Sequence, residues 1–278
     1  MSTAGEAMAA AASRLRAAGV PDPARDARLL LAHAASVDAS RVTLIAPEEI
    51  APEIAERFET LIALRAIRVP VSQLVGSRAF YGRDFRISRH VLDPRPETET
   101  LIELALSQPF ETVLDLGTGS GCILVTLLAE QPGARGVGVD RSEDACLQAS
   151  ANAVLLGVQG RAEIYQSNWF DKVGGRYDLI VANPPYLAAS EMAGIAPELR
   201  DHEPQMALTD GLDGLSAYRI IAAQAQGFLT ENGRVMVEIG WQQGQAVCDI
   251  FHRSGWAQVD LAEDLDGRPR VVCAGQPA

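Results

Sequence analysis

The stretch Asn183-Pro184-Pro185-Tyr186 places groups that could orient a flat, nitrogen-bearing substrate directly after the apolar run LIVA at 179–182. The run is typical of a buried strand, and the two prolines end it because they donate no backbone hydrogen bond and fix φ. The Asn183 side-chain oxygen and the Pro184 carbonyl can each accept one N–H of an amide or aromatic amine, while Tyr186 can cover its flat face. A nitrogen held in this way can present its lone pair to an electrophile without a general base. The motif therefore predicts group transfer to a planar nitrogen, whereas a Pro-Pro loop that only ends a strand would not explain the flanking Asn and Tyr.

A second motif, VLDLGTGSGC, follows the order strand, glycine-rich turn, helix. Glycine allows a tight turn and a close approach of a ligand to the main chain. A dinucleotide fingerprint would be G-x-G-x-x-G, but here the third glycine comes one residue early and Cys122 occupies the fingerprint position. This spacing favours a cofactor without a pyrophosphate, and a plain tight connection is the alternative. The turn residues expected to face the ligand are Gly117, Thr118, Gly119, Ser120 and Gly121.

Two further strand ends carry candidate contacts to a nucleoside. Asp140 ends the stretch GVGVD, where an acidic side chain can accept hydrogen bonds from both ribose hydroxyls. Helix capping is the alternative role, although Ser142 could serve it instead. At the tip of the next strand, Asn168 could accept from an adenine amino group and Trp169 could border the ring. A turn residue and a core residue are the alternatives for these two.

The elements that must position these residues alternate from residue 112 onward. Strands are expected at 112–117, 135–140, 161–167, 177–183 and 234–239, and helices at 120–131, 142–156, 214–229 and 242–254. Two last strands, 257–263 and 269–274, flank the turn DLDGRP and should be antiparallel to each other. The pattern predicts an α/β, Rossmann-like, doubly wound sheet of about seven mostly parallel strands, with the ligand crevice at their carboxyl ends.

A small helical part precedes this sheet. The predicted domains are a helical N-terminal domain at 1–75, a β-hairpin linker at 76–92 and the main domain at 93–278. Helical spacing runs through PDPARDARLLLAHAAS, with Asp22 as N-cap and Pro23 at the first helical position, and through PEIAERFETLIALRAI. GSRAFYGRDFRIS alternates around Gly82 as a hairpin does. Leu187–Asp213 lacks clear periodicity, and so long a loop is expected to be functional, as part of a substrate mouth.

Composition limits the possible partners. The net charge is −12, and no basic region suited to phosphate binding is evident in the sequence. Both observations argue against a nucleic-acid substrate and fit a basic partner, such as a protein that works on RNA. No apolar run approaches the length of a membrane span, and the N-terminus lacks the apolar core of a signal peptide. Without C-x-x-C pairs or metal-ligand histidine spacing, the cysteines are expected to be buried, reduced thiols of a cytoplasmic protein, with all but Cys146 in apolar surroundings. These cysteines are Cys122, Cys146, Cys248 and Cys273.

The glycine turn, Asp140 and the Asn-Pro-Pro-Tyr motif together resemble class I S-adenosylmethionine-dependent methyltransferases that act on planar nitrogens. DPRPETETLIELAL (93–106) and WQQGQAV (241–247) are similar to one branch, the PrmC/HemK family, and the resemblance covers essentially the whole chain. It implies S-adenosyl-L-methionine as cofactor. As substrate it implies the glutamine side chain of the Gly-Gly-Gln motif in class-1 peptide chain release factors.

The resemblance also implies site residues in the PRPET segment. Arg95, Pro96, Glu97 and Thr98 would border the cofactor and substrate pocket. Arg95 could pair with a carboxylate, and a surface helix start capped by Thr98 is the alternative. Two positions depart from the family pattern. Asp93 stands where an apolar residue is usual, and Asn168 stands where aspartate is commoner, although an amide oxygen can still accept the adenine N–H.

The leading hypothesis is a protein-glutamine methyltransferase that acts as a monomer, with Asn183, Pro184, Pro185 and Tyr186 as its catalytic residues and the N-terminal domain recognising the release factor. The nearest alternative is an adenine-N6 nucleic-acid methyltransferase, which shares the Asn-Pro-Pro-Tyr motif; the acidic balance and the lack of a basic recognition region oppose it. An NAD-dependent oxidoreductase is opposed by the glycine spacing and by the lack of a hydride-site acid. A non-catalytic nucleotide-binding module would leave the motif unexplained.

Overall fold

The computed structural model describes residues 2–275, so the outermost predicted bounds, residue 1 and residues 276–278, lie outside the described part. The chain divides into two compact units. The first combines Met1–Ser77 with Ala196–His202, and the second combines Arg78–Ile195 with Glu203–Ala278. The segment 196–202 lies within the stretch that we expected to form an irregular loop, yet it packs with the N-terminal helices.

The first unit is helical. Its elements are α1 (Ala4–Ala17), α2 (Pro23–Ala35), α3 (Val42–Ile45), α4 (Pro52–Ala66), α5 (Val71–Val75) and α9 (Pro197–His202). Asp22 is the N-cap residue of α2 and Pro23 occupies its first turn, both as predicted, although the Asp22 side chain makes no capping hydrogen bond. Buried Leu30, Phe58 and Ile62 belong to the core of this unit.

The second unit contains a hairpin and a seven-stranded sheet. The hairpin strands are β1 (Ser77–Phe80) and β2 (Arg83–Arg86). The sheet strands are β3 (Thr112–Leu116), β4 (Arg135–Asp140), β5 (Ala162–Gln166), β6 (Tyr177–Ala182), β7 (Leu229–Glu238), β8 (Gln258–Glu263) and β9 (Pro269–Gly275). Their order is β5-β4-β3-β6-β7-β9-β8, and only the pairings of β9 are antiparallel. The predicted fold class is therefore confirmed, although β7 begins at Leu229 rather than at residue 234.

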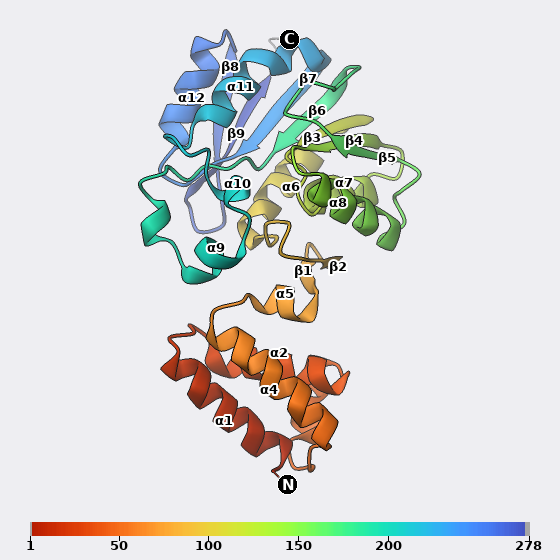
Figure 1. The fold of residues 1–278 in the computed structure, drawn as a ribbon. Coiled ribbons are helices and arrows are strands. Elements are labelled where there is room, and N and C mark those ends of the chain that lie inside the picture. The colour runs from red at the N-terminus through yellow and green to blue at the C-terminus, as the bar shows by residue number, and fades with distance from the viewer. Residues whose placement is uncertain (1, 276–278) are drawn as a thin grey trace. The chain divides into compact units, whose positions relative to one another are not determined.

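Helices cover both faces of this sheet (Figure 1). They are α6 (Glu99–Leu106), α7 (Cys122–Glu130) and α8 (Glu143–Leu155) on one face, and α11 (Ser216–Gln224) and α12 (Gly244–Arg253) on the other. In β6, Leu179 and Val181 pack toward the first group, and Ile180 and Ala182 pack toward the second. Because both faces are covered, the strand is a continuous apolar run rather than an alternating one.

The described residues form no disulfide, no metal-binding cluster and no membrane-spanning helix. All four cysteines are free; Cys146, expected outside apolar surroundings, is buried, and the other three are only half-buried. Among residues 2–275 no group of histidine, cysteine or acidic side chains is arranged to hold a metal ion. In the same residues no helix has both the length and the apolar content to cross a bilayer.

Candidate active site

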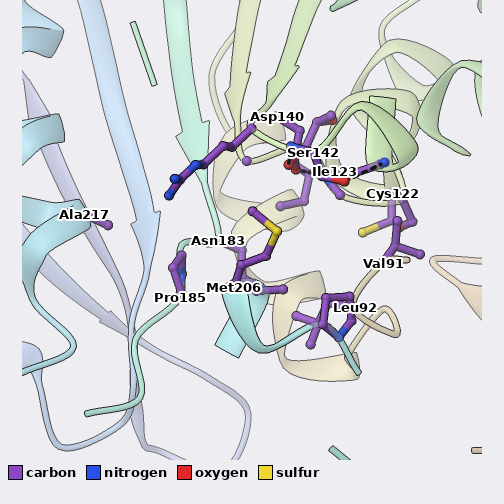
Figure 2. A pocket seen from close by; sticks show the side chains of 18 of the residues that line it. Val91, Leu92, Cys122, Ile123, Asp140, Ser142, Asn183, Pro185, Met206 and Ala217 are labelled. Atoms are coloured by element: carbon purple, nitrogen blue, oxygen red, sulfur yellow. Dashed lines mark hydrogen bonds between the residues drawn. The ribbon is translucent and has the colours of Figure 1, made fainter. Parts of the chain in front are cut away.

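The site lies where the strand order reverses, between β3 and β6. Leu116 pairs with Ala182 in the parallel register, so the glycine turn and Asn183 leave the sheet side by side. A cavity of about 280 Å³ opens there (Figure 2). The predicted site residues that line it are Arg95, Thr98, Gly117, Thr118, Gly119, Ser120, Asp140, Asn168, Trp169, Asn183 and Pro185.

Five predicted site residues do not line the cavity, and two of them are Pro96 and Glu97 of the PRPET segment. Gly121 is the N-cap residue before α7, and a Cβ at this position would lie 3.0 Å from that of Ala149, so it serves close helix packing. Pro184 is buried. The ring of Tyr186 lies against Gly240.

The glycine turn has the backbone conformation that the sequence predicted. Gly117, Gly119 and Gly121 have φ values of 73°, 54° and 79°, in the left-handed region that favours glycine. The N–H groups of Gly117 and Thr118 donate to the Val139 carbonyl at 2.8 and 2.9 Å. These bonds tie the turn to the end of β4, next to Asp140.

Asp140 closes the turn from the other side. One carboxylate oxygen accepts the N–H of Gly119 at 3.0 Å, and the other accepts the N–H of Ser142 at 2.8 Å. Burial raises the pKa of this carboxyl, and the two backbone hydrogen bonds oppose the rise. The Ser142 hydroxyl accepts the Ala145 N–H of α8, so the helix is capped by serine and the capping alternative for Asp140 is wrong. Each oxygen of Asp140 keeps a further lone pair for a ligand hydroxyl.

Asn168 and Trp169 reach the cavity from the end of β5. Trp169 has a φ of 52°, a backbone conformation that residues other than glycine rarely adopt and that often marks functional sites. Asn168 is exposed, and its amide nitrogen donates to Asp171 at 3.3 Å. Both residues are therefore placed for the predicted contacts, and those contacts stay a prediction.

Asn183 has a divided environment. Its side-chain nitrogen donates to the Thr98 hydroxyl at 3.2 Å, while its side-chain oxygen is buried and has no hydrogen-bond partner among the described residues. Thr98 is 2% exposed and makes no capping bond to α6, so the capping alternative for this residue is wrong. An unpartnered buried acceptor at a cavity wall is costly unless a ligand donates to it.

The sequence did not identify three polar residues that brace the site. Arg95 pairs with buried Glu203 at 2.6 Å; burial raises the pKa of the Glu203 carboxyl, and the charge of Arg95 opposes this. Gln243 donates to the Tyr186 carbonyl at 2.8 Å and accepts from the Gly240 N–H at 3.1 Å. The third, Glu238, ends β7.

The stretch Leu187–Asp213 contributes part of the cavity wall, through Met206, Thr209 and Asp210. It is not a structureless loop, because it contains α9 and α10 (Gln205–Leu208). Nothing in its local pattern indicated these short helices or the role of Glu203.

Comparisons with known proteins agree with this geometry. Residues 6–76 match the model of the PrmC N-terminal domain, and residues 88–211 match that of the methyltransferase small domain. The chain is 54% identical over 275 residues to the release factor glutamine methyltransferase of Cereibacter sphaeroides, covering 99% of each chain. It is 42% identical over 271 residues to the protein of that name from Agrobacterium fabrum, covering 95% of this chain and 94% of the relative.

A solved methyltransferase structure from Pyrococcus furiosus shares the fold. It matches with a TM-score of 0.55 at 14% identity, covering 72% of this chain and 92% of that one.

Proposed function

The chain belongs to the PrmC family of release factor glutamine methyltransferases, and we propose that it methylates the side-chain amide nitrogen of a release factor glutamine, using S-adenosyl-L-methionine. The glutamine is that of the Gly-Gly-Gln motif in class-1 peptide chain release factors. The observation that carries this proposal is the buried side-chain oxygen of Asn183 at the cavity wall, which has no hydrogen-bond partner among residues 2–275.

The groups around the cavity fit the cofactor. The Asp140 carboxylate suits two ribose hydroxyls, and Asn168 and Trp169 suit an adenine edge and face. The glycine turn leaves room for a ligand against the main chain, since nothing lies within 4 Å of a Cβ built on Gly117. When bound, the cofactor supplies an electrophilic methyl group.

The chain itself contributes orientation and electrostatics. A glutamine amide nitrogen is a poor nucleophile because its lone pair is delocalised into the carbonyl. We propose that the Asn183 side-chain oxygen and the Pro184 carbonyl each accept one of its N–H bonds, which fixes the direction of the lone pair. Gln243 holds the carbonyl of Tyr186, and so keeps the backbone of the motif rigid while the substrate is aligned.

The remote part of the release factor is proposed to bind the helical N-terminal domain. Binding energy from such a contact can fix the geometry at the reacting atom, so a folded factor should be a better substrate than a short Gly-Gly-Gln peptide. The acidic chain, with a net charge of −12, should associate more slowly with a basic partner as salt rises. Equal efficiency on both substrates at all salt concentrations would contradict this part of the proposal.

The main test is incubation with labelled S-adenosyl-L-methionine and a class-1 release factor or its Gln→Ala variant. Label should enter the native factor only. Asn183→Ala should reduce turnover on the order of 10²-fold with cofactor affinity retained, because one orienting acceptor is lost. Gln258→Ala, which removes an exposed carboxamide on the edge strand β8 and does not touch the cavity lining, is the matched control and should keep full activity. Label on duplex DNA adenine and none on the release factor would overturn the substrate assignment.

A further inference from the structure

We propose that Glu238 is a positioning residue that determines which end of the Asn183 carboxamide faces the substrate. The proposal rests on the role of Asn183 proposed above and extends it to a group outside the cavity wall. Its basis is the juxtaposition of Glu238, Thr98 and Asn183 at the adjoining ends of β6, β7 and α6.

Strand register brings Glu238 to Asn183. Ala182 pairs with Val237 in the parallel ladder between β6 and β7, so Asn183 and Glu238 are the next residues along neighbouring strands. Ala182 and Val237 pack into the cluster beneath α11 and α12. Because side chains alternate along a strand, the two polar residues point to the opposite face, toward α6. The residue before α6 is Thr98.

A carboxamide has one accepting end and one donating end, and only its oxygen can accept an N–H from the substrate. The Asn183 nitrogen donates to the Thr98 hydroxyl oxygen at 3.2 Å, which leaves the hydroxyl hydrogen free to donate further. The Thr98 and Asn183 side chains lie near the Glu238 carboxyl and lower its pKa as hydrogen-bond donors. An ionised carboxylate only accepts, so it holds the Asn183 nitrogen on its own side and leaves the oxygen for the substrate.

A structural role alone does not explain a carboxyl group at this place. Glu238 is 1% exposed, and one of its oxygens has no hydrogen-bond partner among the described residues. Arg270 lowers the pKa of Glu238 through its charge but makes its own ion pair with Asp264 at 3.1 Å. A buried carboxyl without an ion pair destabilises a fold, and a neutral side chain of the same size would be tolerated better.

Protonation of Glu238 should remove its control over the orientation of the Asn183 carboxamide. Burial raises the pKa of the Glu238 carboxyl to about 7, and the hydrogen bonds and Arg270 oppose the rise only in part. Once protonated, Glu238 can donate, and the flipped Asn183 carboxamide is no longer excluded. The other charged or titratable groups near Glu238 are Glu97, Cys122, Tyr186 and Tyr218. The thiol and the two phenols stay neutral at pH 7 because burial raises each pKa.

Glu238→Gln is the decisive variant, because it keeps the shape and the backbone carbonyl that accepts from Tyr218 but can no longer select donors. We expect kcat to fall between about 10- and 100-fold, with KM for the release factor and the affinity for S-adenosyl-L-methionine little changed. In the native enzyme kcat should rise with pH through about 7, and this rise should be absent from the variant. Asp115, the other buried carboxyl with a pKa near 7, is present in both proteins. A rise that persists in Glu238→Gln would therefore overturn the proposal.

A double variant separates positioning from stability. If Glu238 acts through Asn183, then Asn183→Ala combined with Glu238→Gln should turn over no more slowly than Asn183→Ala alone, and multiplying losses would overturn the proposal. Thr98→Val should reproduce the loss of kcat and Thr98→Ser should restore it, which gives a second test should Glu238→Gln fold poorly. Glu263→Gln, exposed on β8, is the control with unchanged kcat. If the native enzyme does not label the release factor at all, the proposed function fails and this inference is not the cause.

Discussion

Replacing Asp140 with alanine should weaken the binding of S-adenosyl-L-methionine by about 1–3 kcal/mol, roughly 5- to 150-fold in Kd. Two hydrogen bonds to ribose hydroxyls are lost, and hydrogen bonds to an ionised acceptor lie at the stronger end of the range. The Gly119 and Ser142 N–H groups, at 3.0 and 2.8 Å from the carboxylate, also lose their acceptor. The glycine turn should therefore loosen, which places the expected loss in the upper half of that range.

Asp140→Asn tests the contribution of a single carboxylate oxygen. It keeps one acceptor but turns the other oxygen into an NH₂ group, which meets the N–H of either Gly119 or Ser142. Its affinity should lie between those of the native protein and Asp140→Ala. Glu143→Ala is the matched control, because this acidic side chain in the first turn of α8 is exposed and does not line the cavity.

Isothermal titration calorimetry at about pH 8 measures these affinities, with melting curves to confirm that each variant is folded. A pH above neutrality is chosen because burial raises the pKa of Asp140. An unchanged Kd for Asp140→Ala would remove the residue from the cofactor site. Tight binding of NAD in the same experiment would refute the assignment of the cavity as a whole.

Three further predictions concern stability and are checked by denaturant unfolding. Gly121→Ala should destabilise the fold by more than Gly157→Ala does, since both have positive φ, which costs about 1–2 kcal/mol, but only Gly121 also has a close neighbour. Because the pKa of Glu238 is raised from 4.5 to about 7, native stability should fall by up to about 3 kcal/mol as pH rises through that interval, and Glu238→Gln should lack this component. Arg65→Ala should lose about 3–5 kcal/mol because it leaves the buried carboxylate of Asp26 unpaired, whereas Glu198 keeps its ion pair with Arg68; native-like unfolding would contradict that.

The sheet was predictable because its strands are marked locally. The run at 179–182 is apolar on both faces and stops just before a proline pair, and its sheet neighbour β3 ends at the glycine turn, so the ends of both strands were found to within a residue or two. α9 was missed for the opposite reason. It is a short helix whose Glu198 is held by Arg65 at 2.9 Å and Arg68 at 2.6 Å, residues far away in sequence. Local periodicity carries no information on such partners.

Among the site residues, too, those that are marked locally were predicted and those that depend on a distant partner were missed. Gly117, Asp140 and Asn183 were identified because parallel strands bring their carboxyl ends to one edge, so strand ends with polar residues converge there. Glu203 was missed because its importance depends on a single partner, Arg95, which no spacing indicates. Glu238 could have been found by the first rule, since it is an acidic residue at the end of a strand.

The two most deeply buried carboxyl groups near the cavity have similar surroundings. Asp115 accepts from the Thr118 hydroxyl, and Thr98 lowers the pKa of Glu238 as a hydrogen-bond donor, so each carboxyl stands behind a threonine that lines the cavity. Burial raises the pKa of both to about 7, which means that each ionised carboxylate destabilises the folded chain. Carboxylates behind a cavity wall make its potential negative, and in a low-dielectric site this favours a ligand that carries a positive charge. S-adenosyl-L-methionine carries its positive charge on the sulfonium, next to the methyl group to be transferred. Each of these two ionised carboxylates therefore destabilises the free protein, and binding of the positively charged sulfonium near them would restore stability.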